Sequence, residues 1–323
     1  MVLRYDSAVL LTIGIPTYNR AEDVRKTVTE ILAHEDSELV DIVVIDDGGT
    51  DDAAERLCAD PAVVDRVRVL RNPENLGYAG TFARLFRECE TEYLMLTADD
   101  DRVLMENIRA LVEYLSDHAP VFVSPQFLRD GRVSRGRSFT GAIAPRDFLA
   151  ASAHAPGLVY RVEDCLPALG ELAERAEAEE VDALVYPQVH IAMRLMLAGE
   201  RCSWLALPTV AEGAYRPSGI RDAAGGQYWS VESRWKQLQA YDALLSRWTA
   251  DDASGRAQEM LTAQRDRAFH AIASAIRMEH PDLGAAFDEG ARRRYQRTLR
   301  SRILAVPIVG WVVRQRRSFA RRS

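Results

Sequence analysis

The first 125 residues alternate short β-rich runs with stretches of helical period. The predicted strands are Val9–Ile15, Asp41–Ile45, Arg66–Leu70, Tyr93–Thr97 and Val121–Ser124. The predicted helices between them are Glu22–Ala33, Asp51–Ala59, Tyr78–Cys89 and Leu104–Leu115. Strands that alternate with helices form βαβ units, and near-continuous apolar strands are typical of a sheet covered on both faces. This half of the chain therefore predicts an α/β fold with a doubly wound, mostly parallel sheet.

The second half has a weaker pattern. Asp130–Gly141 is rich in Gly, Arg and Ser and predicts a mobile loop, whereas Val181–Ala198 predicts a helix and Ser203–Leu207 a strand. Residues 230–280 predict helices. Their apolar stripe, at helical spacing, consists of Val231, Trp235, Leu238, Tyr241, Leu245 and Trp248. We therefore expect a helical extension after the α/β part.

Composition places the chain among ordinary globular proteins, with 47% hydrophobic and 28% charged residues in a length of 323. The four cysteines form no CxxC pair, which argues against a zinc ribbon and a disulfide framework. No run reaches the ~18 apolar residues of a membrane-spanning helix, and the N-terminus lacks the pattern of a signal peptide. We therefore expect a cytoplasmic protein.

Acidic residues gather where two predicted strands end. The strand Tyr93–Thr97 leads into Asp99–Asp101, and another strand leads into the loop Asp46–Asp52. Two like charges about 4 Å apart cost about 4 kcal/mol near a protein surface, and a bound Mg²⁺ or Mn²⁺ offsets such a cost. For Asp99–Asp101 taken alone, the alternative is that these acids simply begin the next helix. Because ligands bind beyond the carboxyl ends of parallel strands, the pair of loops favours a site for a metal and a nucleotide diphosphate.

Four motifs follow one another in the first 118 residues. They are Pro-Thr-Tyr-Asn-Arg after a strand at Ile15–Arg20, an apolar strand into Asp-Asp-Gly at Val43–Asp51, Asn-x-Gly at Asn75–Gly77, and Asp-x-Asp at Asp99–Asp101. In order and spacing this set resembles family 2 glycosyltransferases with the GT-A fold, although Gly49 stands where serine is commoner. The Asp-Asp-Asp form and the second half resemble the abequosyltransferase-like branch.

The resemblance implies a role for the motif residues. Tyr18 would lie near the nucleotide base, Asp46 would accept a hydrogen bond from it, and Asp99 would face the ribose. Asp99 and Asp101 would bind the metal. The donor-binding residues would be Pro16, Thr17, Tyr18, Asn19, Arg20, Asp46, Asp47, Asn75, Gly77, Asp99 and Asp100. Arg216, after the strand at Ser203–Leu207, would meet the diphosphate; an ordinary surface arginine is the alternative.

The general base does not follow from the motifs. Many inverting members carry Glu-Asp before a helix of the type that Met193–Gly199 matches, but Pro187 and Gln188 occupy those positions here. His190 has a side chain suited to proton transfer near neutral pH, and Glu163 and Asp164 form the nearest Glu-Asp pair. A half-buried histidine and two solvated acids are the alternatives, so all three stay candidates.

The tail from Gly290 onward contains eleven arginines and no acid, on a chain whose net charge is −7. Its apolar centre, Ile303–Val313, is too short to span a bilayer but suits an anionic membrane surface. A basic helix packed on the acidic body or on a second subunit is the alternative. Nucleic acid is not an expected partner, since no aromatic-interleaved basic surface appears elsewhere.

These features predict a metal-dependent inverting glycosyltransferase with Mg²⁺ or Mn²⁺ and a nucleotide sugar as donor. Its acceptor would be a hydroxyl of a glycan or lipid-linked glycan, and it would be cytoplasmic or peripheral at the inner face of the membrane. The alternatives are a catalytically degenerate assembly subunit that binds nucleotide sugars and a sugar-phosphate nucleotidylyltransferase. The expected regions are 1–125 for nucleotide-sugar binding, 126–215 for the acceptor side of the same GT-A domain, 216–290 for the helical extension and 291–323 for a basic amphipathic tail.

Overall fold

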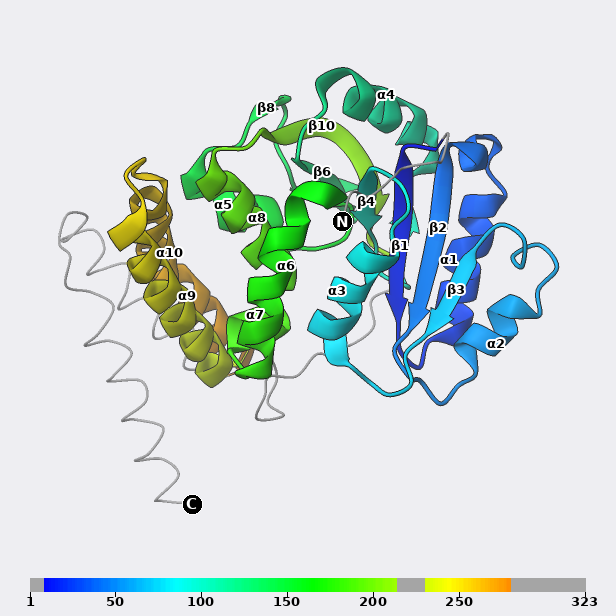
Figure 1. Ribbon diagram of the computed structural model, residues 1–323, viewed down its shortest axis with the longest axis horizontal. Coiled ribbons are helices and arrows are strands. Elements are labelled where there is room, and N and C mark those ends of the chain that lie inside the picture. The colour runs from blue at the N-terminus through cyan, green and yellow to red at the C-terminus, as the bar shows by residue number, and fades with distance from the viewer. Residues whose placement is uncertain (1–8, 214–229, 280–323) are drawn as a thin grey trace, which may run out of the picture. The chain divides into compact units, whose positions relative to one another are not determined.

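The computed structural model describes residues 9–213 and 230–279. The chain divides into two compact units, residues 1–220 and residues 221–323. The first contains the sheet and the second a pair of helices (Figure 1).

The first unit is built on one ten-stranded sheet in the order β3-β2-β1-β4-β9-β6-β10-β5, with β7 paired to β6 and β8 to β10. The strands are β1 (Leu11–Thr17), β2 (Val40–Asp46), β3 (Arg68–Arg71), β4 (Tyr93–Leu96), β5 (Arg102–Val103), β6 (Phe122–Arg129), β7 (Arg132–Arg135), β8 (Gly141–Ala142), β9 (Val159–Arg161) and β10 (Cys202–Ala211). Strands β3, β2, β1 and β4 are parallel, as predicted, and β6 is parallel to β10. Strand β9 runs antiparallel between β4 and β6, which makes the sheet mixed.

The helices of the first unit are α1 (Ala21–Leu32), α2 (Ala53–Cys58), α3 (Gly77–Glu88), α4 (Ile108–His118), α5 (Phe148–Ser152), α6 (Val162–Glu177), α7 (Val181–Val185) and α8 (Pro187–Ala198). The predicted helices within the first 125 residues are confirmed, with small shifts at their ends. The predicted helix Val181–Ala198 is two helices, α7 and α8, which meet where Pro187 begins α8.

The two faces of β1 show why the sheet is covered on both sides. Leu11, Ile13 and Ile15 alternate onto one face and are fully buried in the core that α1, α2 and α4 complete. On the other face Gly14 leaves room for α3, because a Cβ there would lie 3.2 Å from Leu85 Cδ2. Figure 1 shows α3 across the sheet from α1. This double cover explains the continuous apolar runs of the sequence.

The expectation of a mobile loop at Asp130–Gly141 is wrong. Residues Arg132–Arg135 form β7, which pairs antiparallel with β6. The turn between the two strands is Asp130-Gly131, and both residues have positive φ (50° and 71°). Asp-Gly is a strong signal for a two-residue β-hairpin. The composition of the segment obscured that signal.

The described part of the second unit consists of α9 (Val231–Asp251) and α10 (Arg256–Glu279). Ser230 caps α9 by accepting a hydrogen bond from Ser233 N–H at 3.2 Å. Val231, Tyr241 and Leu245 of the predicted stripe are buried, and Trp235 and Leu238 pack against a cluster formed with Ile272 and Ile276. Within the described ranges, no helix is long and apolar enough to cross a membrane.

Candidate donor-binding site

Three loops meet at the carboxyl edge of the sheet. The first follows β1, the second follows β2 and the third follows β3. Gly48 lies against the third loop, where a Cβ would be 2.9 Å from Asn75 N. Gly49 lies against the first loop, where a Cβ would be 3.0 Å from Asn19 Oδ1. Asn19 also accepts a hydrogen bond from Thr50 N–H at 2.7 Å. The first three motifs of the sequence are therefore neighbours in space.

Asp46, the last residue of β2, is fully buried and has one unused oxygen. Its Oδ1 accepts a hydrogen bond from Gly49 N–H at 2.8 Å. Its Oδ2 accepts none from the described residues, and the nearest cation, Arg71 Nη1, is 3.7 Å away. A buried carboxylate oxygen without a donor is costly, so this atom suits a ligand N–H.

Asp47 holds the third loop in place. Its Oδ1 accepts hydrogen bonds from Asn72 Nδ2 at 2.6 Å and from Leu76 N–H at 2.9 Å. Asn75 stays exposed and accepts from Gly77 N–H at 2.8 Å, at the start of α3. Gly77 has φ of 69° and open space where a Cβ would stand. Asp47 thus fixes the loop between β3 and α3, a role the motif alone did not indicate.

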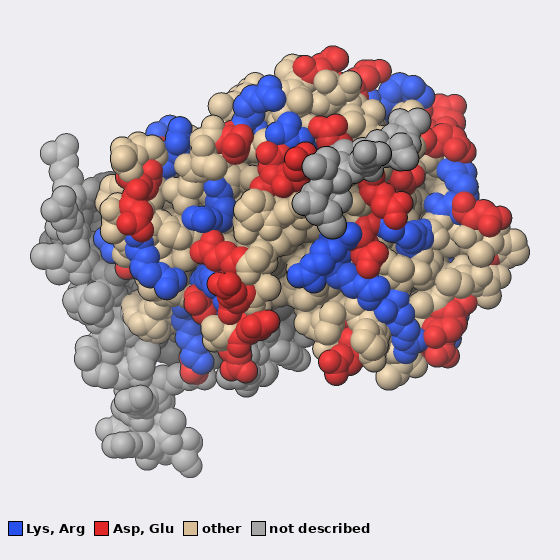
Figure 2. Space-filling view, in the orientation of Figure 1, with Lys and Arg blue, Asp and Glu red and all other residues tan. Residues whose placement is uncertain are grey.

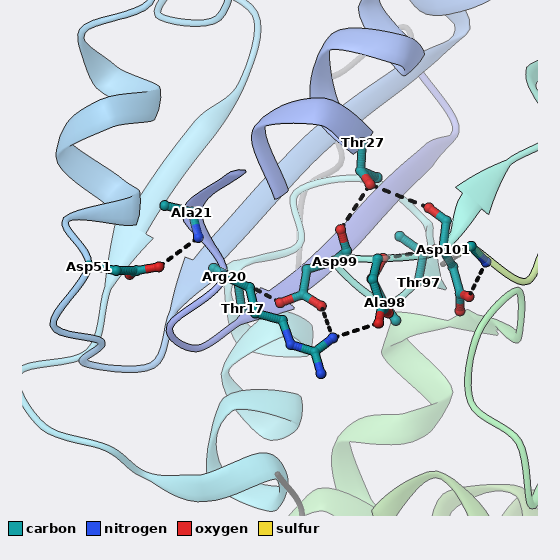
Figure 3. Close-up of polar contacts among 11 residues, drawn as sticks. Thr17, Arg20, Ala21, Thr27, Asp51, Thr97, Ala98, Asp99 and Asp101 are labelled. Atoms are coloured by element: carbon teal, nitrogen blue, oxygen red, sulfur yellow. Dashed lines mark hydrogen bonds and ion pairs between the residues drawn. The ribbon is translucent and has the colours of Figure 1, made fainter. Parts of the chain in front are cut away.

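Asp99 is clamped on both oxygens. Thr17 donates its hydroxyl to Oδ2 at 2.8 Å, and Arg20 Nη1 lies 3.2 Å from Oδ1. The same Arg20 nitrogen lies 2.6 Å from Asp100 Oδ2, so one guanidinium bridges two neighbouring carboxylates (Figure 3). The first motif and the Asp-x-Asp motif therefore form one electrostatic unit.

Asp101 is held mainly through its backbone. Thr27 of α1 donates its hydroxyl to the carbonyl of Asp99 at 2.9 Å and lies 3.4 Å from that of Asp101 (Figure 3). The Asp101 carboxylate accepts a hydrogen bond from Gly213 N–H, just after β10, at 3.2 Å. At Gly213 a Cβ would stand 1.6 Å from the carbonyl oxygen of Asp100, so only glycine fits.

Both outer aspartates are buried in a way that disfavours their charge. Asp99 is 7% exposed and Asp101 8%. Burial raises the pKa of Asp99 to about 6 against the lowering effect of Arg20, and burial raises the pKa of Asp101 to about 6 against its bond from Gly213. Asp101 forms no ion pair with any arginine or lysine that the structure describes. It is therefore the carboxylate best suited to a cation.

A divalent metal fits this donor set if water and phosphate complete its coordination. No group of three or more His, Cys, Asp or Glu residues that could enclose a metal occurs in the described parts of the chain. Mg²⁺ usually needs only one or two carboxylates and takes its other ligands from water and phosphate. Asp101 meets that need, while Asp99 would share its oxygens with Thr17 and Arg20.

Residues 12–153 match the family model described as "Glycosyl transferase family 2". This match spans β1 to α5 and includes all four motifs, the last of which is the Asp99–Asp101 cluster.

The chain contains a family 2 glycosyltransferase domain.

Solved structures support the same fold for this glycosyltransferase. TarS of S. aureus, residues 1–349, is 14% identical with a TM-score of 0.57, covering 81% of this chain and 72% of that one. Its complex with UDP-GlcNAc gives 15% identity and a TM-score of 0.58, over 81% and 73% of the two chains. Mannosyltransferase PcManGT from Pyrobaculum calidifontis, solved with GDP-Man and Mn2+, is 16% identical with a TM-score of 0.51, over 97% and 85%.

These likenesses establish a GT-A-type fold with additional C-terminal helices. A comparison with curated protein sequences gives no match. The abequosyltransferase-like branch stays a prediction.

Two of the expected general bases, Glu163 and Asp164, lie near the start of β4. Glu163 and Asp164 begin α6, directly after β9, whose Arg161 pairs with Tyr93 at the start of β4. Asp99 follows the other end of β4, six residues on, which is about 20 Å of extended chain. Asp164 also forms an ion pair with Arg161. Both acids therefore lie near the start of β4, whereas the Asp99–Asp101 cluster follows its other end.

His190 is buried between α6 and α8. It is 1% exposed, its Nδ1 lies 3.0 Å from Arg175 Nη1, and its Nε2 lies 3.6 Å from Glu171 Oε2. Arg175 and Glu171 both belong to α6, so the imidazole faces that helix. In this position His190 is buried and joins α6 and α8.

Gln188, at the position where many family members have an acid, is a packing residue. It is 2% exposed, and its Oε1 lies 3.4 Å from the hydroxyl of Tyr78. Its carbonyl accepts a hydrogen bond from Tyr160 at 3.1 Å, and its Nε2 donates to the carbonyl of Ala153 at 3.2 Å. The side-chain amide thus connects α8 with α3 and the end of α5, and the backbone carbonyl of Gln188 connects α8 with β9.

The remaining site residues are placed as follows. Tyr18, directly after β1, is 45% exposed, and Pro16 near the end of β1 is half-buried. Arg216 and the arginine-rich tail lie outside the described residues. Three residues that hold the site loops were missed: Thr27, Asn72 and Gly213. Only the Gly after the strand Cys202–Ala211 had a local signal, because glycine often marks a close backbone approach.

Proposed function

We propose that this glycosyltransferase moves a sugar from a nucleotide-diphosphate sugar to an acceptor hydroxyl with inversion at the anomeric carbon and with Mg²⁺ or Mn²⁺. The observation that carries the proposal is the cluster at the end of β4, where Asp99 and Asp101 are buried within reach of Thr17, Arg20 and Gly213. The family match and the nucleotide-sugar complexes of the structural neighbours support the donor class. Inversion rests on the family resemblance.

The donor would lie across the carboxyl edge from β2 to β4. Asp46 Oδ2, which is buried and without a donor, would accept a hydrogen bond from the base, and exposed Tyr18 would cover the base. Asp101, with Asp99, would hold the metal, which supplies positive charge to the leaving diphosphate. Arg20 would contribute a second cation at the same place, since it is already fixed beside Asp99 and Asp100.

In one step the acceptor oxygen would form a bond to the anomeric carbon, the bond between that carbon and the diphosphate would break, and the hydroxyl proton would pass to a general base. Because Glu163 and Asp164 lie near the start of β4 and His190 is buried, we propose none of them as the base. This leaves the catalytically degenerate assembly subunit as the second candidate, and the buried amide of Gln188 at the usual acid position is the observation in its favour.

Turnover separates the two candidates. UDP-GlcNAc and GDP-mannose, each with Mn²⁺, are incubated with the full chain and a panel of glycan and lipid-linked acceptors, and nucleoside diphosphate release is measured. NMR of the product then gives the anomeric configuration. Release with an inverted product supports the transferase. Donor binding without release over the whole panel favours the assembly subunit.

A further inference from the structure

The loop of residues 153–158, which leads from α5 into β9, lies beside the candidate site. Its Gly157 N–H donates to the carbonyl of Leu96, the last residue of β4, at 2.6 Å. At its other end the carbonyl of Ala153 accepts from Gln188 Nε2 at 3.2 Å. The loop therefore bridges the end of β4, three residues before Asp99, and the start of α8.

A buried arginine fixes the centre of this loop. Arg135 of β7 is 6% exposed, and its Nη1 donates to the carbonyls of His154 and Pro156, both at 2.6 Å. Its Nε and Nη2 lie 3.3 and 3.1 Å from the carbonyl of Pro125. Bonds from a cation to carbonyls are strong, so the position of residue 154 is set by its backbone, independently of its own side chain.

The order of strands indicates what lies opposite this loop. A donor with its base at β2 and its diphosphate at β4 continues along the sheet order towards β9 and β6. Because β9 is antiparallel to β4, its first residue, Val159, lies near the carboxyl end of β4, opposite Met95. The sugar, which is attached to the diphosphate, is thus directed towards the loop that enters β9.

His154 is the polar side chain of this loop with unused hydrogen-bonding capacity. Its ring packs on Phe127 of β6, with 4.2 Å between the ring centroids, and the side chain is half-buried. Its buried Nδ1 has no hydrogen-bond partner among the described residues. Since a buried polar atom without a partner costs about 1–3 kcal/mol, the arrangement calls for a ligand that supplies one.

We propose that His154 binds a hydroxyl group of the transferred sugar through its imidazole. The inference rests on the proposed function, which places a nucleotide sugar at Asp99–Asp101. It adds a residue that selects for the sugar rather than for the nucleotide.

The charge state of His154 favours binding over proton transfer. Burial, followed by the charges of Arg135 and Arg129, lowers the pKa of His154 to about 3. A general base that works at neutral pH has a pKa near 7. A neutral imidazole at this position still donates and accepts hydrogen bonds, so its contact with a sugar hydroxyl is independent of pH over the neutral range.

Binding measurements with matched ligands test the inference. Calorimetry with Mn²⁺ compares UDP with UDP-GlcNAc and GDP with GDP-mannose, for the full chain and for His154→Ala. One net hydrogen bond corresponds to about 0.5–1.5 kcal/mol, so we expect the variant to bind the nucleotide sugar about 3- to 10-fold more weakly and the nucleotide within about twofold of the unsubstituted chain. His154→Asn, which keeps a polar group near the Nδ1 position, should recover part of the loss.

His118→Ala on α4, which removes an exposed histidine stacked on Tyr114, is the control and should change neither affinity. If His154→Ala weakens the nucleotide and the nucleotide sugar equally, or weakens neither, the inference is wrong while the proposed function stands. If no nucleotide binds the unsubstituted chain, the proposed function fails and the inference fails with it.

Discussion

At the scale of single residues, the site is defined by carboxylates whose charge the protein alone does not fully compensate. Asp99 has Arg20 and Thr17, whereas Asp101 has one backbone N–H. Arg20 offsets one of the three negative charges at positions 99–101. A divalent cation would neutralise the remaining two, so the charges of the site match one metal ion.

The pKa values of the two outer aspartates predict how stability depends on pH. Both pKa values are raised from 3.8 to about 6, so the folded state binds more protons than the unfolded state between these values. Without metal, the free energy of unfolding should therefore rise as pH falls from about 7 to about 4.5, by at most about 3 kcal/mol for each group.

Urea denaturation in EDTA over this pH range measures the effect. Asp101→Asn should flatten the dependence, since an amide does not titrate. The stability of the unsubstituted chain could instead fall as pH is lowered, with no difference in Asp101→Asn. That result would show that folding does not raise the pKa of these carboxylates.

The motif residues could be proposed from the sequence because each motif is local. The strand ends at Asp46 and Asp99 and the loop at Asn75–Gly77 follow directly from short patterns. The partners of these residues did not, because Thr27, Asn72 and Gly213 act across 25 to 112 positions of sequence. The position of Glu163 and Asp164 in the fold did not follow from the sequence either, since spacing does not show that β9 reverses direction.

At the scale of elements, the loop between β3 and α3 depends on one buried amide. Asn72 is 1% exposed and donates to Asp47 at 2.6 Å and to Thr81 at 2.8 Å. Asn72→Ala leaves Asp47 with one donor fewer in a buried place, which should destabilise the fold by about 1–3 kcal/mol. Urea denaturation measures it. Asn75→Ala, which loses an exposed local bond, should cost far less, and equal losses would contradict this role for Asn72.

The end of β10 positions the Asp99–Asp101 loop. A Cβ at Gly213 would overlap the carbonyl oxygen of Asp100, so Gly213→Ala must push the Asp99–Asp101 loop away. We expect Mn²⁺ affinity in the presence of UDP or GDP to fall at least tenfold, measured by electron paramagnetic resonance of free Mn²⁺. Gly170→Ala on α6, where a Cβ meets nothing within 4 Å, is the control. Unchanged Mn²⁺ affinity in Gly213→Ala would show that the loop does not set the metal site.

At the scale of the whole molecule, the parallel sheet was predictable and its antiparallel insertion was not. Apolar runs and helical periods in the first 125 residues specify β1 to β4 with their helices. Strand β9 has only three residues and β8 two, and pairing between distant segments forms them. Segments this short show no alternation of apolar and polar residues from which a strand could be predicted.

The charge distribution of the molecule leads to a prediction about membranes. Acidic and basic side chains are mixed on the face shown in Figure 2, with acids gathered over α6 and α7. The eleven arginines after Gly290 contrast with that surface. We expect the full chain to float with vesicles of anionic lipid and a chain ending at Gly290 to float less, with the difference reduced in high salt. Equal recovery of the two chains would remove the membrane proposal.

The most direct test of the donor site is a thermal-shift series with UDP, GDP, dTDP and CDP, each with Mn²⁺, Mg²⁺ or EDTA. One nucleotide should raise the Tm only when metal is present, because a ligand at about 100 times its Kd adds about 2.7 kcal/mol to stability. Asp101→Ala should abolish this shift, and Asp117→Ala, an exposed acid on α4, should keep it. No metal-dependent shift with any nucleotide in the folded, unsubstituted chain would contradict a metal–nucleotide site at Asp99–Asp101.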